Sequence, residues 1–156
     1  MKIQEQDLFH GAAITQIVEF VNGNDLSITK AENKFGHYII NNRIHIVMKY
    51  RSNNRSPWRF GFSLNEIGLI NATLKEKRDI FLVLICGSTT ICVLNRAEIE
   101  ECINVLSDIE QWISVSSKYG SSLWINGSKA KIQYSIRHND YPRKLFEIGD
   151  DNIEKR

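Results

Sequence analysis

Four basic side chains lie close together in one stretch of the sequence. Lys49 and Arg51 end a segment of alternating apolar and polar residues, and Arg55 and Arg59 fall in and just after the polar loop that follows. Cations on adjacent strands form a stripe that can neutralise the phosphates of a nucleic-acid backbone. The spacing therefore favours contact with DNA or RNA, and a solvated polar face is the alternative explanation.

The segments that carry these cations are expected to be strands. Residues 44–50 alternate between two faces, and Trp58–Phe62 alternate again after the loop. Asn41 and Asn42 suit a tight hairpin turn before the first of these strands, because asparagine tolerates positive φ. We expect the two strands to pair with each other through the loop.

Helices and further strands are predicted on either side. Asp7 is expected to cap a helix of about four turns with apolar positions at helical spacing, and two short strands should follow at 26–31 and 37–41. Ser63 and Glu66 have the spacing of a capping box at the start of a second helix. The elements expected after it are a continuously apolar strand at 80–86, a strand at 89–94, and a helix capped by Asn95 and Glu98.

The C-terminal third is predicted to form a small antiparallel β appendage. Its strands are expected at 112–116, 123–125 and 131–137, with a short segment at 141–146 after them. The whole is expected to be one domain over 1–149, with a core at 7–106, an appendage at 111–147, and a frayed charged tail at 150–156. The predicted fold class is α/β (α+β), with a central mixed sheet flanked by helices.

Composition limits the function classes. The chain has 156 residues, a net charge of +2 and 42% hydrophobic residues, which is typical of a globular protein with any nucleic-acid surface confined to a local patch. No apolar run is long enough for a signal peptide or a membrane span, so a cytoplasmic protein is expected. Cys86, Cys92 and Cys102 lie in apolar segments without metal-ligand spacing and are interpreted as buried thiols.

Histidines and tryptophans are further candidates for function. His10, His37, His45 and His138 have acid–base and metal-binding chemistry, but no H-x-x-x-H or H-E-x-x-H spacing joins them. Trp58 and Trp124 could stack on nucleic-acid bases, although large aromatics at alternating strand positions are more often core.

The order of elements over residues 7–106 resembles the α-β-β-β-α-β core of the PD-(D/E)XK nucleases, in particular the resolvase-like members. The resemblance implies a divalent-metal site, with Glu19 matching the helix acid and Lys49 the catalytic lysine. Val47 stands where the family has Asp or Glu, and residues 37–41 contain no acid. The implied metal ligands are Glu19 and Asp25, and Mg²⁺ is the implied cofactor if the site is active.

The sequence therefore predicts a nuclease-like domain with an incomplete metal site that binds nucleic acid or a protein partner. Lys49, Arg51, Arg55 and Arg59 are its expected nucleic-acid contacts. One alternative is an active nuclease in which Asp25 or Glu32, together with Glu19, rebuilds the ion site around Lys49. Another is a protein-binding protein of the inhibitor or immunity type.

Overall fold

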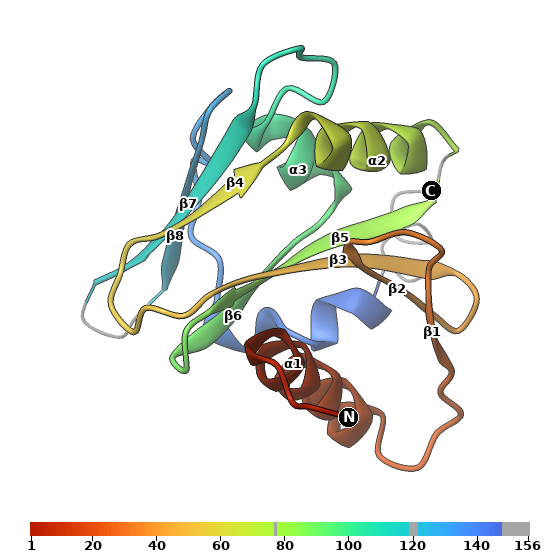
Figure 1. Ribbon diagram of the computed structural model, residues 1–156. Helices are drawn as coiled ribbons and strands as arrows, with labels where there is room; N and C mark the ends of the chain where they lie inside the picture. Colours follow the sequence, from red (N-terminus) through yellow and green to blue (C-terminus); the bar gives the residue numbers. More distant parts are fainter. Residues whose placement is uncertain (77, 119–121, 148–156) are drawn as a thin grey trace.

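A computed structural model describes residues 1–76, 78–118 and 122–147, and it shows two β-sheets with helices packed around them (Figure 1). This mixed α+β architecture confirms the predicted fold class. The helical elements are α1 (Glu5–Val21), α2 (Leu64–Lys75), α3 (Arg96–Cys102), and the 3-10 turns η1 (His138–Asp140) and η2 (Arg143–Phe146). The strands are β1 (Ile28–Lys30), β2 (Gly36–Ile40), β3 (Ile44–Arg51), β4 (Trp58–Phe62), β5 (Asp79–Cys86), β6 (Thr90–Leu94), β7 (Gln111–Ser117) and β8 (Leu123–Gly127).

The larger sheet has the strand order β1-β2-β3-β5-β6. Strands β3 and β5 are parallel, and the other neighbouring pairs are antiparallel. The apolar run at 80–86 lies inside this sheet as β5 and is buried on both faces, as predicted. Asn41 and Asn42 both have positive φ, 52° and 57°, and they turn β2 into β3 as expected from their side chains.

Helix α1 covers one face of this sheet. Its buried residues Ala13 and Ile17 share an apolar cluster with Ile46 and Met48 of β3. The helix begins earlier than predicted, because Gln4 is the N-cap and the Asp7 side chain closes a capping box from inside the first turn. It ends at Asn22, whose left-handed backbone (φ 45°) stops the helix.

The other face packs against α2, α3 and the smaller sheet. Val47 and Leu84 point into this second cluster, together with Ile67 and Ile70 of α2. The capping boxes predicted at Ser63 with Glu66 and at Asn95 with Glu98 are both present. The three cysteines are free and buried, as interpreted from the sequence.

The partner of β4 was predicted wrongly. Instead of pairing with β3, β4 pairs with β7, from Trp58 opposite Val115 to Phe62 opposite Gln111. Most of β3 has no edge left for β4, since β2 lies beside it over residues 44–48 and β5 lies along its whole length on the other side. Leaving the large sheet lets β4 bury Phe60 and Phe62 in the second cluster.

The predicted C-terminal strands are confirmed as β7 and β8, which with β4 form a three-stranded antiparallel sheet. The third predicted strand, at 131–137, makes only isolated bridges to β8, between Leu123 and Ile136 and between Asn126 and Lys131. The tail predicted at 150–156 lies outside the described residues.

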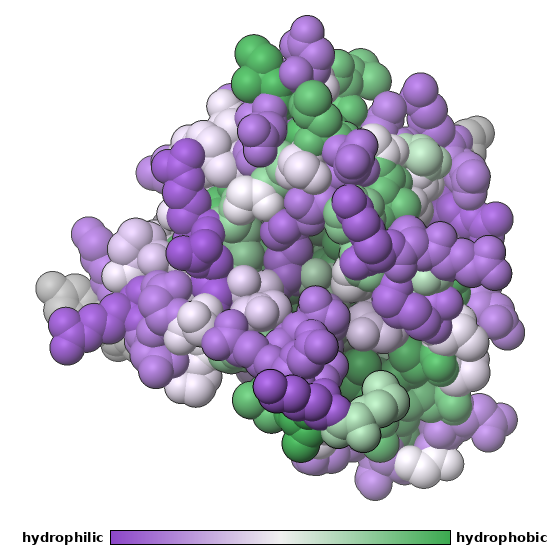
Figure 2. All heavy atoms as spheres, in the orientation of Figure 1, coloured by the Kyte–Doolittle hydropathy of each residue, from purple (hydrophilic) through white to green (hydrophobic). Residues whose placement is uncertain are grey.

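The surface is not uniform. In Figure 2, hydrophobic side chains gather at the bottom over α1 and again at the top, whereas the left flank over β4, β7 and β8 is purple and pale. The exposed apolar residues of α1 include Leu8, Val18 and Phe20. No helix in residues 1–76, 78–118 and 122–147 is long and apolar enough to cross a membrane.

Candidate functional site

The ammonium group of Lys49 forms an ion pair within the protein. Its nitrogen lies 2.5 Å from a carboxylate oxygen of Glu66 at the start of α2 and 5.0 Å from the centre of the Phe62 ring. The Glu66 carboxylate also accepts a hydrogen bond from the backbone N–H of Ser63. Both oxygens of Glu66 are thus engaged, and the positive charge of Lys49 is compensated before any ligand arrives.

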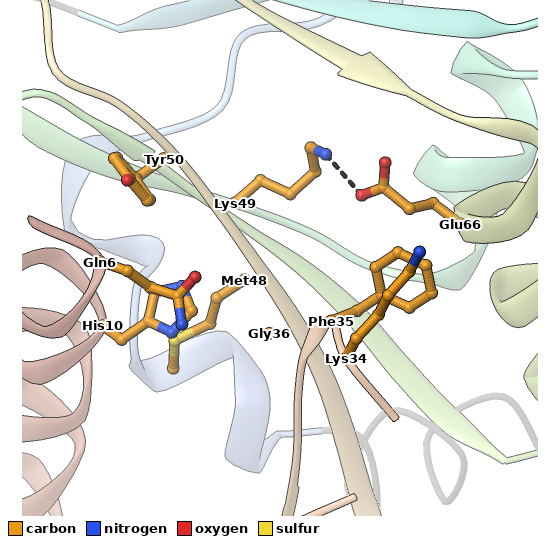
Figure 3. A pocket seen from close by; sticks show the side chains of 9 residues that line it. All are labelled: Gln6, His10, Lys34, Phe35, Gly36, Met48, Lys49, Tyr50 and Glu66. Carbon is orange, nitrogen blue, oxygen red and sulfur yellow. Dashed lines mark hydrogen bonds and ion pairs between the residues drawn. The ribbon is translucent and has the colours of Figure 1, made fainter. Parts of the chain in front are cut away.

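A polar cavity of about 220 Å³ opens beside this ion pair (Figure 3). It wraps around the end of β3, where Gly36 begins β2 and leaves the last residues of β3 without a neighbour on that side. A side chain at Gly36 would collide with the carbonyl oxygen of Met48 at 2.6 Å. Glu66 is the one carboxylate among the described residues that line the cavity.

The structure does not bring the other implied nuclease residues to Lys49. Glu19 is exposed on α1, which covers the face of β3 that presents Ile46 and Met48, whereas Lys49 alternates to the opposite face. Asp25 and Glu32 are exposed in the connections around β1, away from the cavity lining. In the described part of the chain, no three His, Cys, Asp or Glu side chains form a group that could hold a metal ion. These donors do not fit a Mg²⁺ site.

Arg51 is the exposed last residue of β3, and Arg55 lies in the exposed loop between β3 and β4. Backbone and side-chain contacts hold this loop: the N–H of Gly87 donates to the Arg51 carbonyl at 2.8 Å, and the indole N–H of Trp58 donates to the Asn53 carbonyl at 2.7 Å. The end of β3 and the loop are therefore fixed in position, although the side chains of Arg51 and Arg55 face solvent.

Arg59 belongs to a different surface, the solvent side of β4, β7 and β8. We call this surface the tryptophan face, and its residues are Arg59, Gly61, Trp112, Ser114, Ser116, Trp124 and Asn126. The Arg59 guanidinium lies 4.4 Å from the centre of the Trp112 ring, which is close enough for a cation–π contact.

Trp124 occupies the other end of the tryptophan face. Its side chain is 43% exposed, and it lines a shallow cavity of about 370 Å³ together with Asn126 and Lys131. No aspartate or glutamate occurs in β4, β7 or β8. The face therefore combines aromatic rings and cations without a carboxylate in its strands.

The tryptophans predicted for stacking differ in position. Trp124 is exposed, but Trp58 is 1% exposed and lies in the core, which the alternative interpretation of the strand pattern had predicted. Trp112 was missed as a site residue. Its signal was present in the alternation of 112–116, where Ile113 and Val115 are buried and Trp112 must face the other way.

Two histidines form a buried pair that no sequence spacing indicated. The hairpin register places His37 and His45 on one face of neighbouring strands, with His37 Nε2 2.9 Å from His45 Nδ1. The side-chain oxygen Oδ1 of Asn33 accepts from the Phe35 N–H, so the Asn33 side-chain nitrogen Nδ2 donates to His37 Nδ1. His37 then donates to His45, and the Nε2 proton of His45 has no partner in the described structure.

Burial keeps this histidine pair neutral. Loss of solvation, followed by the charges of His45 and Lys30, lowers the pKa of His37 to about 4. Burial and then the charge of Arg78 lower the pKa of His45, against smaller opposing effects of Glu76 and Asp79. Near neutral pH both imidazoles are therefore uncharged members of the folded core.

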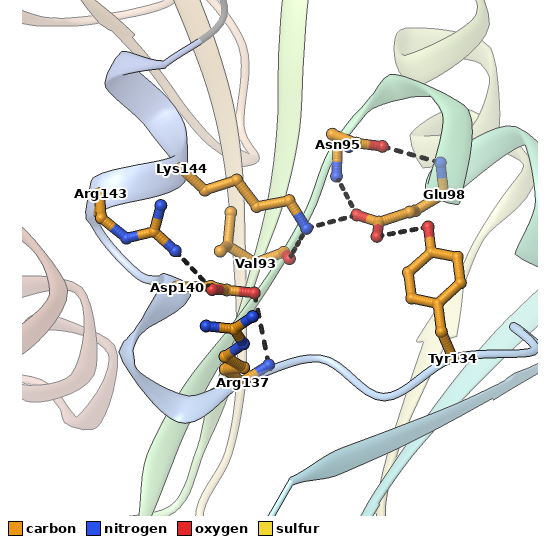
Figure 4. A network of polar contacts seen from close by, with 8 residues as sticks. All are labelled: Val93, Asn95, Glu98, Tyr134, Arg137, Asp140, Arg143 and Lys144. Carbon is orange, nitrogen blue, oxygen red and sulfur yellow. Dashed lines mark hydrogen bonds and ion pairs between the residues drawn. The ribbon is translucent and has the colours of Figure 1, made fainter. Parts of the chain in front are cut away.

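A second buried network surrounds Glu98 at the start of α3 (Figure 4). The Glu98 carboxylate is 2% exposed and lies 2.7 Å from the Lys144 ammonium. It also accepts hydrogen bonds from the Tyr134 hydroxyl at 2.8 Å and from the Asn95 N–H at 2.9 Å. The network connects η2 and the segment after β8 to α3, so its role is structural.

Comparisons with protein-family models, with curated proteins and with solved structures found no match to this chain.

Proposed function

We propose that this chain is a nucleic-acid-binding module. Its contact surface is the tryptophan face together with Arg51 at the end of β3 and Arg55 in the loop that follows. The observation that carries the proposal is the pairing of two outward-facing indole rings, the half-buried Trp112 and the exposed Trp124, with cations on a sheet face whose strands contain no acid. Aromatic platforms with neighbouring cations are how many proteins hold nucleic-acid strands.

The charges of this surface are available to a polyanion. Within residues 1–76, 78–118 and 122–147, no carboxylate pairs with Arg51, Arg55 or Arg59. Lys49, by contrast, is paired with Glu66. Three of the four cations predicted as nucleic-acid contacts therefore support the proposal, and Lys49 does not.

The test is a binding measurement with labelled strands. Fluorescence anisotropy would follow single-stranded DNA, single-stranded RNA and duplex DNA longer than about 16 nucleotides at about 50 and 200 mM salt. We expect affinity to fall steeply with salt for at least one probe. The double variant Arg51→Gln/Arg55→Gln should reduce the slope of log affinity against log salt by about 1.4 to 1.8, because two phosphate contacts are lost.

Lys75→Gln is the matched control for these variants. Lys75 is exposed at the end of α2, a helix outside the three strands that form the tryptophan face (Figure 1), and its loss should leave the slope unchanged. If none of the three probes binds at the lower salt concentration, the proposal is wrong, and a protein-binding role of the inhibitor or immunity type becomes the better hypothesis.

The nuclease resemblance stays a prediction. Its test is nicking of supercoiled plasmid in Mg²⁺ or Mn²⁺ by the wild type and by Lys49→Ala. Nicking that disappears in the variant would establish a metal-dependent nuclease. The structure offers little support for that outcome, because Glu66 is the one carboxylate described beside that lysine.

A further inference from the structure

We infer that the tryptophan face binds unpaired strands and engages two separated bases of one strand at the same time. This inference rests on the proposed function and adds the class of nucleic acid and the length of its footprint. The argument starts from the positions of the two tryptophans.

The sheet register sets the spacing of the two rings. Trp112 is opposite Gly61 and Trp124 is opposite Ser116, so both tryptophans lie on the same face of neighbouring strands. Ser116 is four residues along β7 from Trp112, and strand geometry therefore separates the two tryptophan Cα atoms by about 14 Å. Cα atoms this far apart favour stacking of the two rings on different bases over stacking on the same base.

Each tryptophan has a cation beside it. Arg59 lies against Trp112 at 4.4 Å, and Lys131 lines the same cavity as Trp124. A base can stack on an indole ring or on a guanidinium plane, and a neighbouring cation can hold the adjoining phosphate. The face thus contains two similar units, each suited to one base and one phosphate.

The spacing predicts the length of strand that both units can hold. A stacked strand advances about 3.4 Å per nucleotide, so 14 Å corresponds to about four stacked nucleotides and to fewer if the bases are pulled apart. The footprint that engages both tryptophans is therefore about four nucleotides.

Unpaired strands fit this face better than a duplex. In a duplex the faces of the bases are covered by their neighbours, and the major groove admits a helix or a two-stranded ribbon rather than a flat sheet of three strands. Between the rings the face offers the hydroxyl of Ser114 and, opposite it, the amide of Asn126. An asparagine amide can make two hydrogen bonds to an adenine edge, so we expect a weak preference at one position and no recognition of a longer sequence.

The experiment compares Trp112→Ala and Trp124→Ala on oligothymidylates of different length. With an octanucleotide, which reaches both rings, each variant should weaken binding about tenfold. With a dinucleotide, which reaches only one ring, each should weaken binding no more than about twofold, because the other ring remains available. Trp124→Phe should recover most of the octanucleotide affinity.

Folding of each variant is checked by thermal unfolding. If Trp112→Ala does not fold, Trp112→Phe replaces it, and quenching of tryptophan fluorescence in the wild type gives a second measurement. Trp58 is buried, so quenching by the octanucleotide reports Trp112 and Trp124.

The outcomes separate this inference from the proposed function. Equal losses on the two oligonucleotides, or duplex binding that does not depend on either tryptophan, would overturn the two-base inference and leave nucleic-acid binding intact. Failure of every nucleic-acid probe to bind would overturn both.

Discussion

Polar groups serve different purposes in the interior and on the tryptophan face. In the interior, Glu98 is surrounded by partners from three segments, and Lys49 has its charge compensated by Glu66. On the tryptophan face, Arg59 contacts an aromatic ring and no described carboxylate. Groups whose hydrogen bonds are completed within the fold stabilise it, and groups left facing solvent remain available for a ligand.

This difference predicts which substitutions affect stability and which affect binding. Changes inside should lower the free energy of unfolding and leave nucleic-acid affinity unaltered. Changes on the tryptophan face should weaken nucleic-acid binding and have little effect on the free energy of unfolding.

The largest effect is expected from Lys144→Met. It leaves the Glu98 carboxylate, 2% exposed, without its cation, and an uncompensated buried charge should cost about 3 kcal/mol of the free energy of unfolding. Denaturant unfolding at neutral pH measures the loss, and nucleic-acid binding should be unchanged.

Arg143→Met is the control for that prediction. Arg143 is the neighbouring residue, but its ion pairs with Asp140 and Glu147 are partly exposed, so its loss should cost less than about 1 kcal/mol. Equal losses for the two variants would contradict the distinction between interior and surface polar groups.

A smaller effect is expected from acid. His37 has a pKa of about 4 in the folded protein, below its unfolded value of about 6.5. Between these values the unfolded chain binds more protons than the folded one, so stability rises with pH there and is lost as pH falls from about 6.5 towards 4. We expect a loss of at most about 3 kcal/mol by pH 4 from His37.

Denaturant unfolding at several pH values in this range measures that loss. His37→Gln, which keeps hydrogen-bonding groups but does not titrate, should show a flatter dependence on pH than the wild type. An identical dependence in both proteins would exclude the histidine pair as its source.

The smallest effect on stability is expected from Arg59→Gln. An exposed cation–π contact contributes about 0.5 to 1 kcal/mol, and the unfolding free energy should fall by no more than that. The same variant should lower the salt slope of single-strand binding by about 0.7, measured by anisotropy. A large loss of stability with unchanged binding would place Arg59 among the structural residues and weaken the comparison.

Local patterns in the sequence predicted the local elements correctly. The apolar run at 80–86, the asparagine turn and both serine- or asparagine-based capping boxes depend on neighbouring residues alone. The alternation of Trp58, Phe60 and Phe62 likewise identified a strand with one buried face.

Long-range pairing could not be predicted in the same way. The alternation in β4 specifies which side chains are buried but not which strand lies beside it, and its true partner β7 lies 49 or more residues further along. The same limit applied to the surroundings of Lys49. The sequence placed Lys49 correctly on a strand, but its carboxylate partner Glu66 became evident only from the packing of α2. Trp112 gained its significance from Arg59, which lies on a strand distant in sequence.

The pairing of β4 with β7 also sets an order of events during synthesis. A chain emerging from the ribosome presents Phe60 and Phe62 long before residues 111–117, their eventual covering strand, have been made. Until then these aromatic side chains stay uncovered in the partly formed nascent chain, where they can aggregate or be bound by chaperones. Closure of the small sheet is therefore a late step, and the surface proposed for nucleic acid is complete only after it.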